Sequence, residues 1–166
     1  VLVDLQQSRS FFEGLSPFED PGTTDYPQGH GTFIAGIIGG KGNNGIGISG
    51  VNWGAKCVSF RVFKPITYTN VLGKKVTTLV TGYEEILKAY IALHNLSFER
   101  MVVNSSFSYD VEALGDPTLM KEAIESLTNR ALFVVAAGNT RNAVPQYPAV
   151  LSKEVTNLIT VASIGK

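Results

Sequence analysis

Residues 29–40 form the stretch from which the fold and function of this chain are inferred. They place one of only two histidines between two glycines, in Gly29-His30-Gly31-Thr32, directly before an apolar run over 33–40. The run predicts a helix, with Thr32 able to cap its first turn and Gly31 allowing a tight entry. A histidine held at such an entry faces a cleft rather than a core. Because histidine ordinarily titrates near neutrality, we interpret His30 as a candidate general base.

The composition is that of one globular domain with a core of its own. Of 166 residues, 44% are hydrophobic and 17% charged, and fourteen basic residues balance fourteen acidic ones. No run of basic residues occurs, so the composition indicates neither a nucleic acid nor a membrane as partner. The apolar run over 131–137 is too short to cross a bilayer, and residues 1–15 lack a signal-peptide pattern.

Strand and helix patterns alternate along the chain. Strands are expected at 1–4, 57–63, 101–106, 132–137 and 158–163, and helices from His30, over 83–95 and after Asp116-Pro117. Surface loop is expected over 5–28, a shaped loop over 42–50 and a hairpin over 64–81. The helix over 83–95 should turn five apolar residues toward the core: Ile86, Leu87, Tyr90, Ile91 and Leu93. The alternation predicts an α/β domain with a mostly parallel sheet and helices on both faces.

Polar side chains follow several of the predicted strands. Asp4, Ser105-Ser106 and Asn139 all lie at the ends of apolar runs, and His30 begins a helix after a loop from the same edge. Ligands collect where the strands of such a sheet end, so these residues form a candidate site. The alternative is that Asp4 and Asn139 only cap helices or turns. The single cysteine, Cys57, cannot form an internal disulfide; we expect a small core residue, with a nucleophile as the weaker alternative.

Four motifs, in this order, resemble those of the subtilisin-like serine proteases, the subtilases. They are Gly29-His30-Gly31-Thr32 with Ala35-Gly36, the loop 43–48, the strand 134–139 ending in Gly138-Asn139, and Tyr147-Pro148. The resemblance implies a three-layer α/β/α fold with a mostly parallel sheet. It also implies that 1–166 is a single catalytic domain, incomplete at its C-terminus and open to extension at its N-terminus. A cis bond before Pro148 is expected as well.

The resemblance assigns catalytic roles to three residues. His30 would take the proton from a serine hydroxyl, Asn139 would donate its side-chain amide to the oxyanion, and Asp4 would be the triad aspartate. The subtilase serine lies in a turn well after the oxyanion strand, and nothing like that turn occurs before Lys166. The 166 residues alone are therefore not expected to hydrolyse peptides. Asp4 is followed by Leu5-Gln6 where subtilases have Ser or Thr and Gly; the alternative is an aspartate before Val1, or none.

A calcium site and a substrate site also follow from the resemblance. The expected calcium ligands are the carbonyls of Gly42, Ile46 and Ile48, the side chain of Asn44, and Glu13. The alternative is a loop that keeps its shape without the ion. Substrate would bind along Ser106, Phe107 and Ser108 and against Ala137 and Gly138. Where many subtilases have Ser-Leu-Gly-Gly, this chain has Ser106-Phe107-Ser108-Tyr109, which predicts a reshaped pocket and restricted specificity.

The function predicted from the sequence is that of a serine endopeptidase. Its partners would be a protein or peptide substrate and a propeptide or the rest of the catalytic domain, and the resemblance implies a secreted or extracytoplasmic protein. The alternative is a pseudoprotease or peptide-binding module with the same fold and no competent triad. A flavodoxin-like nucleotide binder would have the same parallel sheet with its ligand at the strand ends. However, the loop after the first strand lacks a phosphate-binding glycine pattern.

Overall fold

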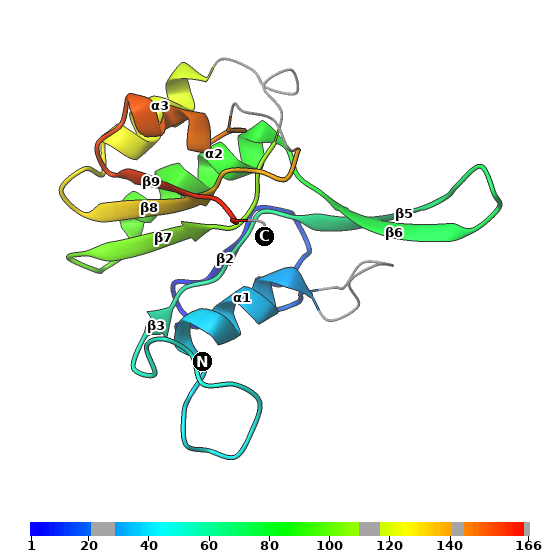
Figure 1. The fold of residues 1–166 in the computed structure, drawn as a ribbon, viewed down its shortest axis with the longest axis horizontal. Coiled ribbons are helices and arrows are strands. Elements are labelled where there is room, and N and C mark those ends of the chain that lie inside the picture. The colour runs from blue at the N-terminus through cyan, green and yellow to red at the C-terminus, as the bar shows by residue number, and fades with distance from the viewer. Residues whose placement is uncertain (21–28, 110–116, 141–144, 165–166) are drawn as a thin grey trace. The chain divides into compact units, whose positions relative to one another are not determined.

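The computed structural model describes residues 1–20, 29–109, 117–140 and 145–164 of the chain (Figure 1). These residues group into two compact units, Val1–Glu85 and Ile86–Lys166. The first unit holds strands β1 to β6 and helix α1, and the second holds strands β7 to β9 and helix α3. Helix α2 (Tyr83–Ala92) begins just before the boundary. In the described parts of the chain, no helix is both long and apolar enough to span a membrane.

Two short parallel strand pairs begin the first unit. Strand β1 (Leu2–Val3) pairs with β3 (Lys56–Cys57), and β2 (Arg9–Ser10) pairs with β4 (Phe60–Arg61). The buried Arg61 side chain extends from β4, where its Nη1 donates to the Ser16 carbonyl at 2.9 Å and its Nε donates to the Phe63 carbonyl at 3.1 Å. One guanidinium thereby fixes the loop after β2, since a buried cation needs such acceptors.

Three expectations for this region are wrong. The strand expected at 1–4 is short and exposed rather than buried, with Leu2 61% accessible. The loop expected over 5–28 contains β2. The strand expected at 57–63 is interrupted at Ser59, whose N–H donates to Ser8 Oγ and whose Oγ donates to the Pro17 carbonyl. Serine hydroxyls here replace ladder bonds, which periodicity alone does not reveal. Cys57 is half-buried, and burial raises the pKa of its thiol.

Helix α1 (His30–Gly39) begins at the predicted histidine and ends at a close backbone contact. The Gly50 N–H donates to the Gly40 carbonyl at 2.8 Å. A Cβ on Gly50 would lie 2.3 Å from the Gly40 nitrogen, so a larger residue cannot occupy position 50 without moving the backbone. The two glycines therefore close the base of the loop between them.

The hairpin expected over 64–81 is confirmed. Strands β5 (Lys64–Thr69) and β6 (Lys75–Val80) pair antiparallel over their full length, as a long twisted ribbon (Figure 1). Asn70 holds the turn, because its Oδ1 accepts the N–H groups of Leu72 and Lys74, both at 3.0 Å.

The second unit is built on a three-stranded parallel sheet. Its strands are β7 (Met101–Ser105), β8 (Ala131–Ala136) and β9 (Leu158–Val161), with β8 in the middle. Helices α2 and α3 (Thr118–Glu125) lie on the same side of this sheet (Figure 1). Two 3-10 helices, Leu93–Asn95 and Ala149–Lys153, complete the unit. This arrangement of helices and parallel strands confirms the predicted α/β class.

The core of the second unit lies between the sheet and its helices. The ring of Tyr90 packs edge-on against Phe133 with the centroids 5.0 Å apart. The buried Asn157 Nδ2 donates to the carbonyls of Ile124 and Ala131 at 2.9 and 3.1 Å, which ties α3 to β8. Such a bond contributes about 1 kcal/mol. The alternate residues of the strands face away from the helices and are accessible, with Val102 at 69%.

The expected core face of α2 is correct in part. Ile86 and Tyr90 are buried as predicted, but Ile91 is 53% accessible, and Ala89 and Ala92 take the remaining core positions. The two alanines allow the helix to approach the sheet closely. The spacing of hydrophobic residues alone does not show that small residues are preferred at these positions. Of the predicted start of α3, Pro117 precedes the helix, and Asp116 lies outside the described residues.

Candidate active site

His30 stands at the first position of α1, with its side chain accessible to solvent. The preceding Gly29 is buried and has φ +73°, a conformation that favours glycine. Gly29 offers no side chain to cap the helix. Thr32 was expected to cap the first turn; instead, its own N–H donates to the Asp20 carboxylate. A side chain from outside the helix therefore supplies the cap, and sequence reasoning missed Asp20.

Asp4 follows β1 and is buried, with both carboxylate oxygens engaged. Its Oδ1 accepts the N–H groups of Gln6 and Gln7, both at 3.0 Å. Its Oδ2 accepts a hydrogen bond from Gln7 Nε2 at 2.8 Å and forms an ion pair with Lys56 Nζ at 2.8 Å. The Lys56 ammonium, and then the hydrogen bonds from Gln7, hold the pKa of Asp4 well below its usual range.

These contacts bear on both interpretations of Asp4. The two N–H bonds are those of a turn cap, which was the alternative to a catalytic role. They also keep the carboxylate ionised, as a triad aspartate must be. Lys56 was not singled out in the sequence, because its partner lies more than fifty residues earlier. The catalytic role of Asp4 stays a prediction.

The second unit brings several predicted substrate-binding residues together through Gln146. Its Oε1 accepts the Ser108 hydroxyl at 2.8 Å, and its N–H donates to the Ala137 carbonyl at 3.0 Å. A Cβ on Gly138 would lie 2.3 Å from the same Oε1, and Gly138 has φ +101°. Gln146 thus joins the segment after β7 to the segment after β8. No sequence pattern pointed to Gln146, which belongs to none of the recognised motifs.

The neighbouring segments extend this arrangement. Tyr109 and Tyr147 exchange backbone hydrogen bonds at 3.1 and 3.2 Å, and their rings stack with the centroids 6.2 Å apart. The bond before Pro148 is cis, as expected. Ser106 Oγ donates to Asn104 Oδ1 at 3.1 Å, and Phe107 is half-buried. Asn139 follows Gly138 and is exposed at the carboxyl end of β8. The structure thus places His30 and Asp4 in the first unit and Asn139 in the second.

The loop between Gly40 and Gly50 has the shaped conformation that was expected. Asn43, Gly45 and Gly47 all have positive φ, and Asn44 Oδ1 accepts the Ile46 N–H at 3.0 Å. Trp53 packs directly against Gly42, where a Cβ would meet the indole ring at 2.2 Å. Within 41–50 the oxygen donors are neutral carbonyls and amides, which suit a hard cation such as calcium, with Glu13 as the expected charged ligand.

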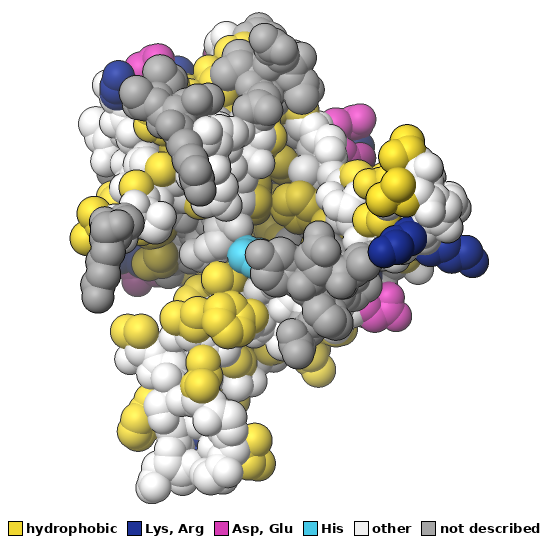
Figure 2. Space-filling model, turned by 45° about the vertical axis from the view of Figure 1, so that its right-hand side comes forward, with side chains coloured by type: hydrophobic (Ala, Val, Ile, Leu, Met, Phe, Trp, Pro, Cys, Tyr) yellow, Lys and Arg dark blue, Asp and Glu magenta, His cyan; other side chains and the backbone are white. Residues whose placement is uncertain are grey.

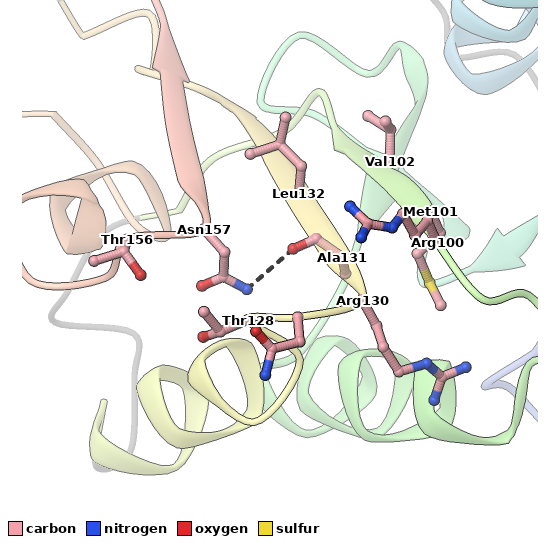
Figure 3. A pocket seen from close by; sticks show the side chains of 10 residues that line it. Arg100, Met101, Val102, Thr128, Arg130, Ala131, Leu132, Thr156 and Asn157 are labelled. Atoms are coloured by element: carbon pink, nitrogen blue, oxygen red, sulfur yellow. Dashed lines mark hydrogen bonds between the residues drawn. The ribbon is translucent and has the colours of Figure 1, made fainter.

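A pocket of about 530 Å³ lies at the edge of the second unit's sheet where the strands begin (Figure 3). Its lining includes Met101, Ala131 and Asn157, which stand at or just before the amino ends of the three strands. The predicted site residues of this unit follow the carboxyl ends. This pocket therefore belongs to a different edge from the candidate active site.

The described surface carries its charge in small groups. On the face drawn in Figure 2, basic and acidic side chains are scattered among polar and apolar ones.

The pattern of motifs and the α/β architecture can be compared with known proteins. A profile of the subtilase family matches residues 2–166, nearly the whole chain. The chain belongs to the subtilase family. Its motif-based resemblance to subtilases is thereby confirmed.

Two relatives of this subtilase chain illustrate the match. It is similar to subtilisin-like protease 1 of Plasmodium berghei (strain Anka), with 28% identity over 164 residues, which cover 82% of this chain and 22% of that protein. It is also similar to the crystal structure of MycP1 with the N-terminal propeptide removed. That likeness has a TM-score of 0.56 and 26% identity, and covers 96% of this chain and 50% of MycP1. The chain thus covers about a fifth of the Plasmodium protein and half of MycP1.

The ion pair of this subtilase chain should make its stability depend on pH. Because the folded-state pKa of Asp4 is lowered from 3.8, the pair stabilises the fold above that pH and loses this effect as the pH falls toward the lowered pKa. Lys56→Gln should therefore lower the free energy of unfolding at about pH 6 and approach the wild type as the pH falls from about 4 toward 2. Urea unfolding at each pH measures this. Lys74→Gln, an exposed hairpin lysine, is the control, and an equal loss at every pH would contradict the prediction.

Proposed function

We propose that this chain is part of a serine endopeptidase that hydrolyses peptide bonds in protein substrates. The observation that carries the proposal is the subtilase match over residues 2–166, which includes His30 at the start of α1 and Asn139 after β8. The nucleophilic serine would come from outside these 166 residues. The proposal concerns the whole protein, of which this chain supplies the base, the oxyanion asparagine and a candidate carboxylate.

In the proposed mechanism His30 transfers one proton in each half of the catalytic cycle. The imidazole takes the proton from the serine hydroxyl as the oxygen attacks the substrate carbonyl, and then gives it to the departing amine. In the second half of the cycle water attacks the acyl-enzyme, and His30 takes the water proton and gives it to the serine oxygen as the acyl–serine bond breaks and the carboxylic acid product leaves. The accessible position of His30 at the start of a helix supports this role, because both partners must reach the ring.

Asn139 would act on the oxyanion. Its side-chain amide would donate to the oxygen that becomes negative during attack, and such a donor is typically worth about 10² to 10³ in rate. The exposure of Asn139 at the carboxyl end of β8, directly after the positive-φ Gly138, supports this role. Asp4 would orient His30, and its lowered pKa supports a permanently ionised carboxylate.

The alternative function is a pseudoprotease or peptide-binding module, and the contacts of Asp4 decide what it would require. The Oδ2 atom of Asp4 is bound by Lys56 and Gln7, so a bond to a histidine would compete with an ion pair of 2.8 Å. If Lys56 and Gln7 keep Asp4 Oδ2 and no histidine can bind it, the domain would still bind substrate but would lack a competent triad.

Labelling of the intact protein with a fluorophosphonate separates the two functions. We expect the wild type to be labelled and His30→Ala to lose labelling by about 10³-fold or more, because the serine then lacks its base. His94→Ala is the matched control, since it removes the other histidine, which bonds Ser126 Oγ. Equal labelling of His30→Ala and wild type would refute the role of His30. A wild type that resists labelling would support the binding module.

We further propose that the substrate pocket is restrictive. The Ser108 hydroxyl is held by Gln146 at the place where many subtilases have glycine, and Tyr109 is fixed by its bridge to Tyr147. These fixed side chains leave less freedom than two glycines would.

The cleavage profile of the intact protein on a peptide library tests the restriction. We expect a narrow set of cleaved sequences for the wild type. Ser108→Gly should broaden that set, because it removes the hydroxyl and its bond to Gln146. A broad wild-type profile would contradict the proposed restriction.

Calcium is proposed as a structural ion of the loop 42–48. The ligands would be the carbonyl oxygens of Gly42, Ile46 and Ile48, the Asn44 side chain and Glu13. The positive φ angles that shape this loop, and its closure by Gly40 and Gly50, support the proposal. The ion would stabilise the loop at the C-terminal end of α1.

A chelator measures the calcium contribution. The melting temperature of the intact protein should fall on addition of EDTA and recover with excess calcium, because an ion that binds only the folded state stabilises it. Glu13→Gln should reduce this difference, and Glu99→Gln, which removes an exposed carboxylate elsewhere, should leave it unchanged. A melting temperature that does not change on addition of EDTA would exclude a structural calcium ion.

A propeptide and an extracytoplasmic location complete the proposal. MycP1 was solved with its N-terminal propeptide removed, and we propose a propeptide for the protein that contains this chain. Secretion is proposed from the family alone.

A further inference from the structure

Asp20 contacts the backbone on both sides of His30. Its carboxylate accepts the N–H of Thr32, the third residue of α1. A helix ordinarily receives this bond from the side chain of its own N-cap residue, but that residue is Gly29 here. Asp20, which lies before α1 in the chain and outside the helix, therefore supplies the cap that Gly29 cannot supply.

The two glycines that flank His30 are shaped around this carboxylate. A Cβ on Gly29 would lie 2.6 Å from both the carboxyl carbon and the backbone carbonyl of Asp20. A Cβ on Gly31 would lie 3.4 Å from Asp20 Oδ2. Position 29 therefore excludes a larger residue unless Asp20 and its backbone move, whereas a Cβ at position 31 would make a van der Waals contact with the carboxylate.

We propose that Asp20 is the positioning residue for His30. The carboxylate accepts the backbone N–H after His30 and lies close against the glycine before it, and so fixes the direction in which the imidazole leaves the helix. Its negative charge also matches the positive end of the α1 dipole. In this role Asp20 acts through the backbone of α1 and not on the reacting atoms. The inference rests on the proposed function, in which His30 is the base, and it gives the first turn of α1 a dedicated support separate from Asp4.

Two substitutions isolate the hydrogen bond. Asp20→Ala removes the acceptor, and Asp20→Asn keeps a side-chain oxygen in the same place without the charge. Glu99→Gln controls for the loss of one exposed carboxylate. The imidazole NMR signals of the intact protein, assigned with His30→Gln and His94→Gln, report the histidine directly. His94 is an internal reference, because its partner is Ser126.

The spectroscopic result does not depend on activity. We expect Asp20→Ala to shift or broaden the His30 imidazole signals while those of His94 stay unchanged, and Asp20→Asn to leave the His30 signals sharp and closer to the wild type than Asp20→Ala does. His30 signals in Asp20→Ala that match the wild type would overturn the inference. Equal changes at both histidines would also overturn it, because they would indicate general unfolding.

The kinetic result links the support to catalysis. Asp20→Ala should lower kcat by about 10- to 100-fold with KM within about twofold, because a misplaced base affects the chemical step. Asp20→Asn should retain at least about a third of the wild-type kcat, and a loss as large as that of Asp20→Ala would refute a role through the hydrogen bond. A wild type that hydrolyses nothing would refute the proposed function, and the NMR comparison would still decide the inference.

Discussion

Both ends of α1 are fixed by backbone contacts that leave no room for a side chain. At its start, Gly29 lies against Asp20, and at its end Gly40 lies against Gly50. The helix between them carries no side-chain cap of its own. Its place relative to the loops before and after it therefore depends on close approach rather than on burial of large residues. The candidate base and the candidate calcium loop stand at opposite ends of this one short helix.

In the second unit, a buried polar pair fixes the end of a strand, as the glycine contacts fix the ends of α1. Tyr90 Oη and Ser105 Oγ are 2.8 Å apart, where α2 meets the last residue of β7. Burial raises the pKa of Tyr90 to about 12, against the opposing effect of its bond to Ser105. The phenol is therefore neutral at any physiological pH, and the pair needs no counter-charge. It anchors the strand end from which Ser106, Phe107 and Ser108 continue toward Gln146.

Local patterns in the sequence predicted most of the regular structure. His30 at a helix start, the hairpin of β5 and β6, and the three strands of the second unit all follow from local patterns of fewer than twenty residues. Asp20, Gln146 and Lys56 were missed because each acts on a residue or segment that the sequence pattern does not connect to it. A carboxylate that caps a helix from outside looks like any loop aspartate. The catalytic roles of His30, Asn139 and Asp4 remain predictions that the family resemblance supports.

The register of the strands has a consequence for the order of folding. The turn between β5 and β6 spans only 70–74, so this hairpin can close on a microsecond scale. The sheet of the second unit joins residues 101 and 131, and β1 and β3 join residues 2 and 56. Loop closure becomes slower and entropically costlier with separation. The two-residue pairing of β1 with β3, which brings Asp4 close to Lys56, is therefore expected to form after the hairpin of β5 and β6.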